Sequence, residues 1–349
     1  MWRSYASSLL LIVLFANVGC GSAPTLHSSE RYPQRLSEWG LFERGIEPNT
    51  HSVIYDLNTP LFSDHAKKQR TLYIPKGQQI TFSPQGDLVF PVGTIISKSF
   101  YYHADDRGHI RADNDGSLKV LETRLLVKQA EGWDALPYVW RGDDAWLAIS
   151  GELLTLSGSY GELNYLVPSK NQCASCHATN HTTGTIEPIG LKIRHINRNQ
   201  PATSVNQLTL LKQRDWLNQS IDPDTAPRAA DAYNESQDLN HRARSYLDVN
   251  CGHCHNPQGA ADTSALFLDY DEHTLADLGV CKPPIAAGRG SGGLNYSIVP
   301  GDAKQSILPF RMASTDPAVM MPELGRSLAD LEGVALIEQW IDTMSGECR

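Results

Sequence analysis

Two five-residue segments carry the cysteines and histidines best suited to chemistry in this chain. Residues 173–177 read CASCH, and residues 251–255 read CGHCH. Two cysteines at this spacing, followed at once by a histidine, could be a redox dithiol, half of a zinc site or an attachment site for haem. The surrounding sequence decides among these three chemistries.

The spacing within each segment has a physical reason. On one helical turn, residues i and i+3 lie on the same side, so both thiols can reach the two vinyl groups of a porphyrin while the following histidine points at the iron. A thioredoxin-like dithiol needs a βαβ unit, which the sequence does not show, and a four-cysteine zinc site would leave the repeated histidine unused. We therefore predict two covalent c-type haems. The expected thioether cysteines and axial histidines are Cys173, Cys176, Cys251, Cys254, His177 and His255.

The N-terminus predicts export. Arg3 precedes a short apolar run, LLLIVLF at 9–15, which is too short to cross a bilayer as a helix and is typical of a secretory signal. The residues NVGC at 17–20 resemble a bacterial lipobox, which implies cleavage before Cys20 and lipidation of Cys20. We therefore expect a lipid-anchored protein on the periplasmic side of a bacterial membrane, with Gly21 favouring the outer membrane. The alternative is ordinary cleavage nearby, which would leave a soluble periplasmic protein.

Lipidation and haem attachment leave two of the seven cysteines, Cys281 and Cys348. Because disulfides persist in exported proteins, we expect these two to pair. Two unpaired buried thiols are the alternative.

The formal net charge of −9 argues against a nucleic-acid partner, since phosphate binding needs clustered Lys and Arg. The same charge is compatible with redox partner proteins that present a basic face.

The pattern of apolar, β-branched and turn-forming residues divides the chain into five parts. We expect a signal peptide at 1–20, a tether at 21–48, a β-rich domain at 49–158, a first haem module at 159–235 and a second at 236–349. Short β-branched and aromatic runs between Gly and Pro turns indicate a sandwich or barrel-like domain, whereas 238–250 and 327–344 have helical periodicity. The predicted fold class is multidomain α+β: an N-terminal β-sandwich-like domain followed by mainly α-helical dihaem cytochrome c modules.

The second haem module resembles a class I cytochrome c. An attachment motif is followed by a variable loop, by MPELG at 321–325 and by a closing helix that contains Trp340. The resemblance implies that Met321 is the axial thioether of the second haem, which would raise its reduction potential. Met320 is the second choice and Met312 a weaker one, and the alternative is that these methionines only fill the core.

The sixth ligand of the first haem stays open, because no methionine lies between His177 and Met312. The candidates are His181, His195 and His241. His195 is favoured because the loop before it could fold over the other face of the haem. A ligand from elsewhere or an open position are further alternatives, and for His253, inside the second motif, we expect a hydrogen-bonding role.

Longer segments extend the resemblance over nearly all of the mature chain. They include YDLNTPLFSDHAKKQRTLYIPKGQQI, LETRLLVKQAEGW, RARSYLDVNCGHCHNP and GVCKPPIAAGRG. Together they resemble a bacterial family of exported dihaem c-type cytochromes with an N-terminal β domain. The resemblance implies electron transfer between redox partners and no catalytic residues. The alternatives are a dihaem peroxidase-like oxidoreductase with an open site on the first haem, or an electron-accepting subunit of a partner dehydrogenase.

Overall fold

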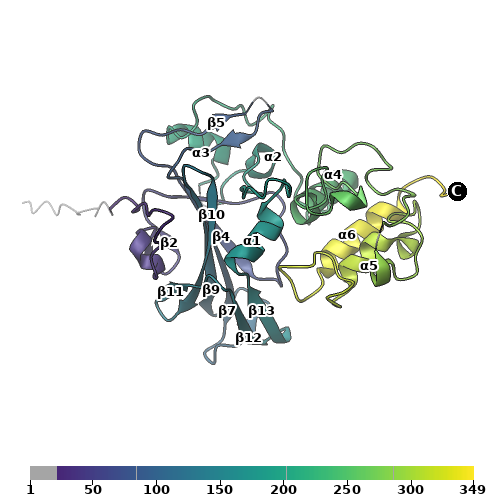
Figure 1. Ribbon diagram of the computed structural model, residues 1–349, viewed down its shortest axis with the longest axis horizontal. Helices are drawn as coiled ribbons and strands as arrows, with labels where there is room; N and C mark the ends of the chain where they lie inside the picture. The colour runs from purple at the N-terminus through teal and green to yellow at the C-terminus, as the bar shows by residue number, and fades with distance from the viewer. Residues whose placement is uncertain (1–21, 84, 202, 286) are drawn as a thin grey trace, which may run out of the picture.

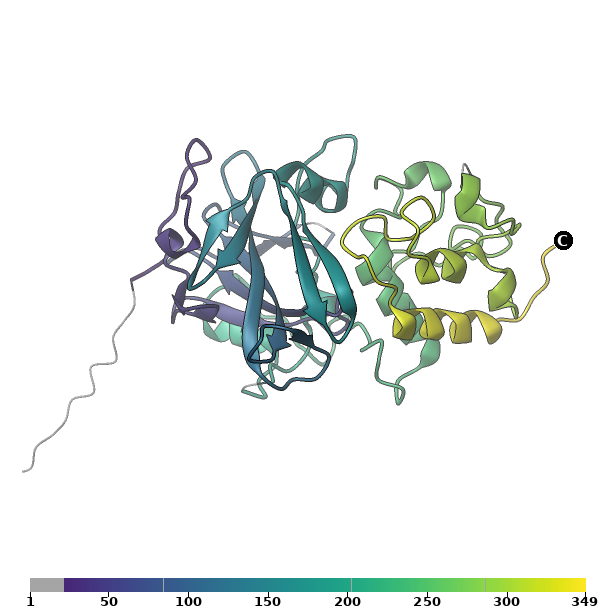
Figure 2. The ribbon, with the colours of Figure 1, turned by 90° about the horizontal axis from the view of Figure 1, so that it is seen from below.

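The computed structural model describes residues 22–83, 85–201, 203–285 and 287–349 and has a mixed α+β fold (Figure 1). A strand-rich half-barrel comes first in the chain and a region with several helices follows. Figure 2 shows the two halves side by side, with the strands at the left and the helices and C-terminus at the right. The α+β class predicted from the sequence is therefore confirmed.

One large sheet dominates the first half. Its path is β11-β10-β9-β7-β8-β12-β13, and β4 joins β3 to β7, which makes nine strands. The pairings are antiparallel except for one parallel bridge, between Gly158 of β12 and Ile110 of β8. The strands are β3 (Val53–Tyr55), β4 (Lys67–Tyr73), β7 (Ile95–Ala104), β8 (Ile110–Arg111), β9 (Ser117–Lys128), β10 (Trp133–Arg141), β11 (Asp144–Leu147), β12 (Glu152–Gly158) and β13 (Gly161–Val167). Of the two architectures expected for this domain, a sandwich or a barrel-like fold, the structure has one half-barrel sheet in which the long strands β7 and β9 pair.

Short elements complete the strand-rich half. Strands β1 (Phe42–Arg44) and β2 (Glu47–Pro48) form one hairpin, and β5 (Thr81–Phe82) and β6 (Leu88–Val89) form another. The 3-10 helix η1 (Leu36–Trp39) covers one face of the sheet, where Leu36 and Trp39 join the core formed by Leu125 and Tyr138. Residues 21–48, expected as a tether, therefore contain an element that is packed into the fold from Leu36 onward.

The segment after the first motif shares a core with the sheet. Helices α2 (Ile193–Ile196) and α3 (Gln207–Gln213) contribute Ile196, Leu208 and Leu211 to the cluster that contains Leu72 of β4 and Ile96 of β7. Strand β13 also extends beyond residue 158, the end that the sequence indicated for the β-rich domain. Much of the predicted first haem module at 159–235 is therefore built onto the sheet, whereas Ala232 and Tyr233 pack with the core of the helical half.

The second half is helical. Helix α4 (Leu239–Leu247) runs on into the π-helical turn η2 (Asp248–Gly252), and α5 (Ile307–Ala313) and α6 (Leu331–Asp342) pack beside them, with short 3-10 turns η3 (Asp262–Ser264), η4 (Gly288–Ser291) and η5 (Ala303–Gln305) between. Helix α6 is capped by Asp330, whose side chain accepts a hydrogen bond from the amide of Gly333. Gly333 also allows α4 and α6 to approach, since a Cβ there would lie 2.3 Å from Oη of Tyr246.

The C-terminus is tied to this half by a disulfide between Cys281 and Cys348, as the sequence predicted. In the described ranges, no helix has the length and apolar character needed to cross a membrane. The predicted signal peptide and Cys20 fall within residues 1–21, which lie outside the described residues.

Polar contacts join the two halves next to the second motif. The amide of Phe62 donates to Oδ1 of Asn250, 2.9 Å away, and Asn250 directly precedes Cys251. In the same module, the amides of Ser327 and Leu328 both donate to Oδ1 of Asp64 at 2.7 Å. The strand-rich half is therefore hydrogen-bonded to the helical module at Asn250 and at Ser327 and Leu328.

Candidate cofactor site

The first motif forms the C-terminal turn of helix α1 (Lys170–His177). Ser169 begins this helix with a capping box, in which its hydroxyl accepts from the amide of Gln172 and the Gln172 side chain accepts from the amide of Ser169. Lys170 holds the helix against strand β10 through an ion pair with Asp134 at 2.8 Å. Cys173 and Cys176 are consequently presented on one helical turn next to the sheet.

The second motif begins in the π-helical turn η2 and continues as one tight turn. The amides of Cys254 and His255 donate to the carbonyl oxygen of Cys251 at 3.0 and 2.9 Å. Gly252 allows this turn to lie against the loop at Asp269, since a Cβ at residue 252 would be 3.0 Å from the Cα atom of Asp269. The first motif therefore lies at the end of helix α1, whereas the second begins in the π-helical turn η2 and continues as one tight turn.

The histidines of the two motifs are held in the same way. Nδ1 of His177 lies 2.8 Å from the carbonyl oxygen of Glu187, and Nδ1 of His255 lies 3.1 Å from that of Leu266. A carbonyl oxygen only accepts, so Nδ1 carries the proton in both rings and Nε2 keeps its lone pair. Burial lowers the pKa of each imidazole to about 4, which keeps both neutral. Neutral imidazoles oriented by a backbone carbonyl are typical metal ligands.

The four motif cysteines are free thiols, and the two motifs lie in contact. Sγ of Cys254 lies 3.6 Å from the carbonyl oxygen of Ser175, and the thiols of Cys176 and Cys254 are hydrogen-bonding neighbours. The chain segments after the motifs also meet, because both the amide and Nδ1 of His181 lie within 3.0 Å of the carbonyl oxygen of Gln258. Groups attached to the two motifs would therefore be neighbours.

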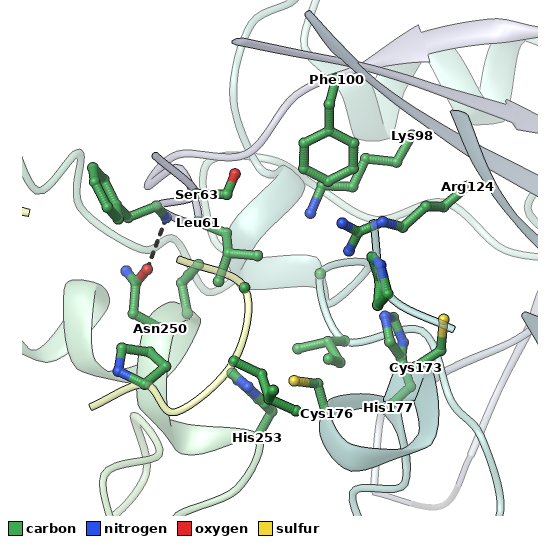
Figure 3. Close-up of a pocket in the computed structure, with 18 of the residues that line it drawn as sticks. Leu61, Ser63, Lys98, Phe100, Arg124, Cys173, Cys176, His177, Asn250 and His253 are labelled. Atoms are coloured by element: carbon green, nitrogen blue, oxygen red, sulfur yellow. Dashed lines mark hydrogen bonds between the residues drawn. The ribbon is translucent and has the colours of Figure 1, made fainter. Parts of the chain in front are cut away.

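A cavity of about 200 Å³ opens between the sheet, the first motif and the helical module (Figure 3). Its wall includes Cys173, Cys176 and His177, and the side of the helical module contributes His253 and Met321. Residues 188–191, which follow the carbonyl that orients His177, form another part of the wall. Most of the remaining wall is apolar, from residues that include Leu57, Leu61, Phe100, Leu126, Val249 and Leu324.

The residues around the cavity fit a c-type haem. Two thiols on one turn, an imidazole with a free Nε2 and an apolar wall are the groups that such a cofactor requires. A zinc ion would require several ligands to converge, and the described residues contain no cluster of three or more His, Cys, Asp or Glu side chains arranged around one point.

The three candidate methionines, Met312, Met320 and Met321, differ in whether they line the cavity. Met321 and Met312 line the cavity, whereas Met320 is buried and does not line it. The loop at Met321 is held by Arg326, whose Nη2 donates to the carbonyl oxygen of Met321 at 2.8 Å. The cavity thus brings Met321 together with His177 of the first motif, although the sequence had assigned it to the second haem.

The structure does not bring His195, the favoured sixth ligand of the first haem, to the cavity. His195 is 2 % exposed, and its Nε2 lies 2.8 Å from Oδ2 of Asp248 in the turn that precedes the second motif. Its ring therefore joins α2 to η2 by facing the buried side chain of Asp248.

The other histidines considered as sixth ligands have partners outside the cavity. His181 uses Nδ1 for the carbonyl oxygen of Gln258, and Nε2 of His241 lies 3.1 Å from the carbonyl oxygen of Arg228. His253 does line the cavity, with its Nδ1 buried and without a hydrogen-bond partner in the described part of the chain.

Basic side chains on the sheet form a part of the cavity that the sequence had not indicated. Arg70 of β4, Lys98 of β7 and Arg124 of β9 line the cavity, and Figure 3 shows Lys98 and Arg124 above His177 and Cys173. Burial, followed by the charges of Arg70 and Arg124, lowers the pKa of Lys98 well below its usual value. The sequence does not show the strand register that aligns these three residues.

We compared the chain with protein-family models, with curated proteins and with solved structures, and none of them matches it. The chemistry of the site is therefore argued from its own residues.

Proposed function

We propose that this protein is a dihaem c-type cytochrome that transfers electrons between redox partners. The observation that carries the proposal is the shared arrangement of His177 and His255. Each follows a Cys-x-x-Cys pair of free thiols, and each has Nδ1 on a backbone carbonyl, so that Nε2 is left to coordinate iron. Two independent copies of this arrangement in one chain support two haems.

When bound, a c-type haem supplies an iron that takes up and gives back one electron. In this proposal Cys173 and Cys176 hold one porphyrin, and Cys251 and Cys254 hold the other. His177 and His255 would coordinate the irons through Nε2, and Met321 would be available as a thioether ligand, which raises the reduction potential of an iron. The apolar wall of the cavity excludes water, which also favours a high potential. The helical half then acts as a cytochrome c-like module, and the sheet supports the first haem.

The contact between the two motifs supports transfer within the molecule. Because Cys254 touches the turn that carries Cys176, porphyrins attached to these two cysteines would have neighbouring edges. A short path between edges is what a two-centre electron carrier needs. The contact between Cys254 and the turn at Ser175 would therefore set how far apart the two attachment sites lie.

The location remains the one proposed from the sequence. Lipidation at Cys20 would anchor the protein on the periplasmic side of a bacterial membrane, and redox partners with a basic face would suit the charge of −9. The disulfide between Cys281 and Cys348 is consistent with an oxidising compartment.

The test is the mass and colour of the mature full-length protein. We expect mass spectrometry to show two covalently added haems and the pyridine haemochrome assay to give two haems per chain. The double variant Cys173→Ala with Cys176→Ala should lose one of them, and Cys251→Ala with Cys254→Ala the other. Cys281→Ala with Cys348→Ala is the matched control and should retain both. Mature wild-type protein with no added mass would refute the proposal.

A second candidate is a peroxidase-like oxidoreductase with an open position on the first haem. It is favoured by the finding that His181, His195 and His241 all have partners outside the cavity. A high-spin ferric signal that changes on addition of cyanide or peroxide would support it, and a purely low-spin signal would support electron transfer alone. Activity that appears only with a partner dehydrogenase would assign the protein as an electron-accepting subunit.

A further inference from the structure

Three cations lie side by side on the face of the sheet that lines the cavity. In the strand register, Arg70 of β4 is opposite Lys98 of β7, and Lys98 is opposite Arg124 of β9. Residues directly opposite on neighbouring strands point to the same face with Cβ atoms roughly 5 Å apart, and like charges at such positions are destabilising. All three residues line the cavity, so a negatively charged ligand bound there would lower the repulsion between their charges.

Only one of the three cations is fully paired. The guanidinium of Arg124 makes two hydrogen bonds to Glu122, from Nε at 2.7 Å and from Nη2 at 2.5 Å. Glu122 is fully buried and also accepts from the hydroxyl of Tyr165 at 2.7 Å. The Glu122 carboxylate is therefore occupied by Arg124 and Tyr165.

The other two cations have unused donors. Arg70, which is 4 % exposed, gives Nη1 to Oδ1 of Asp56 at 3.0 Å, but its Nη2 is buried without a partner. The ammonium group of Lys98 has no hydrogen bond or ion pair with any described residue and lies 4.8 Å from the centre of the Phe100 ring. A buried donor without a partner, such as Nη2 of Arg70, destabilises the fold, and more so when the group is charged.

The charge of the region is also unbalanced. Lys68, on the same face of β4 as Arg70, adds a fourth cation 6.0 Å from the Phe100 ring. Among the described residues, Asp56 and Glu122 are the acidic side chains that form ion pairs with these cations. An anion in the cavity could accept hydrogen bonds from the buried Nη2 of Arg70 and from the partly buried ammonium group of Lys98 beside it, and would offset their positive charge.

We propose that Nη2 of Arg70 and Nζ of Lys98 bind a carboxylate group inside the cavity. The planar guanidinium and the compact ammonium together offer charge-assisted donors of the kind that carboxylates prefer. The carboxylate has two sources: a propionate of the porphyrin held at Cys173 and Cys176, which rests on the function proposed above, or a small free carboxylate that enters the cavity.

The experiment compares wild-type protein with Lys98→Gln and Lys98→Met, all as mature full-length chains. Lys67→Gln is the matched control, because Lys67 is on the same strand as Arg70 but does not line the cavity. The first measurement is thermal unfolding in increasing acetate, with chloride at equal ionic strength as the reference. The second is the resonance Raman band of the porphyrin carboxylates.

A free carboxylate predicts that acetate raises the Tm of wild type and of Lys67→Gln, and that Lys98→Gln and Lys98→Met bind acetate about tenfold more weakly or not at all. A porphyrin propionate predicts no response to acetate but a shifted carboxylate band in the two Lys98 variants alone. Either result supports the site, and the absence of both overturns it. If the protein carries no haem, only the acetate measurement applies, so failure of the proposed function is distinguishable from failure of this site.

Discussion

Sγ of Cys254 lies 3.6 Å from the carbonyl oxygen of Ser175, so the second cysteine pair touches the helical turn that carries the first. The two residues are far apart in the sequence and belong to different halves of the fold. Their contact depends on the polar links that dock the halves, among them the hydrogen bond from Phe62 to Asn250. The arrangement places the two motifs in contact, and this contact supports the proposal of a two-centre electron carrier.

Substitution of Met321 tests the thioether ligand. Met321→Leu preserves volume and should cost less than about 1.5 kcal/mol of stability, but it removes the sulfur. We expect the reduction potential of one haem to fall and that of the other to stay unchanged, because a Met ligand favours the ferrous state. Potentiometric titration measures both values. Met320→Leu is the control, since Met320 does not line the cavity, and an unaltered titration for Met321→Leu would show that this sulfur is no ligand.

Substitution of His195 separates a structural role from ligation. Since Nε2 of His195 faces Asp248, His195→Gln should leave the visible spectrum and both potentials as in wild type while lowering the free energy of unfolding. His177→Ala is the comparison and should alter the spectrum of the first haem. Loss of a low-spin spectrum in His195→Gln would instead restore His195 as the sixth ligand.

The pair formed by His195 and Asp248 predicts a response to acid. Although burial alone would raise the pKa of Asp248, the facing His195 and the nearby Lys192 hold it well below its usual value. A carboxyl group with a lower pKa in the folded state stabilises the fold above its unfolded pKa of about 4, and this contribution is lost as the pH falls below that value. Urea unfolding at a series of pH values between 7 and 3 measures the effect.

Asp248→Asn should remove this acid-dependent component and cost roughly 1–3 kcal/mol at neutral pH. Asp105→Asn is the control, because Asp105 and His109 form an exposed pair that contributes little. If the Asp248→Asn variant retained the full wild-type dependence on pH, the ion pair would not be its source.

Removal of the disulfide tests how the C-terminus is held. Cys281→Ala with Cys348→Ala opens a link between residues 67 apart, for which the chain-entropy model gives about 4 kcal/mol. We expect a lower midpoint of denaturant unfolding and unchanged haem content. Wild-type protein treated with a reductant should behave like the variant, and equal midpoints for oxidised and reduced protein would contradict the prediction.

Much of the site could be predicted from the sequence because its chemistry is local. Cys173, Cys176 and His177 fall on one helical turn by spacing alone, and the same holds for the second motif. The pairing of Cys281 with Cys348 followed from counting the cysteines left in an exported chain. The amphipathic pattern near the C-terminus predicted helix α6, although the structure begins it at Leu331, after its cap at Asp330.

Other features depended on contacts between distant residues. The single sheet, the shared core of α2 and α3 with β4 and β7, and the partner of His195 all arise from long-range packing. The row formed by Arg70, Lys98 and Arg124 exists only in one register of three strands, and a shift by one residue would turn the side chains of a strand to the other face. The sequence by itself determined which groups can bond a cofactor, because spacing along one turn sets their directions. The tertiary structure decided which of them face one cavity and which cations join them, because burial and strand pairing bring together residues that no local pattern relates.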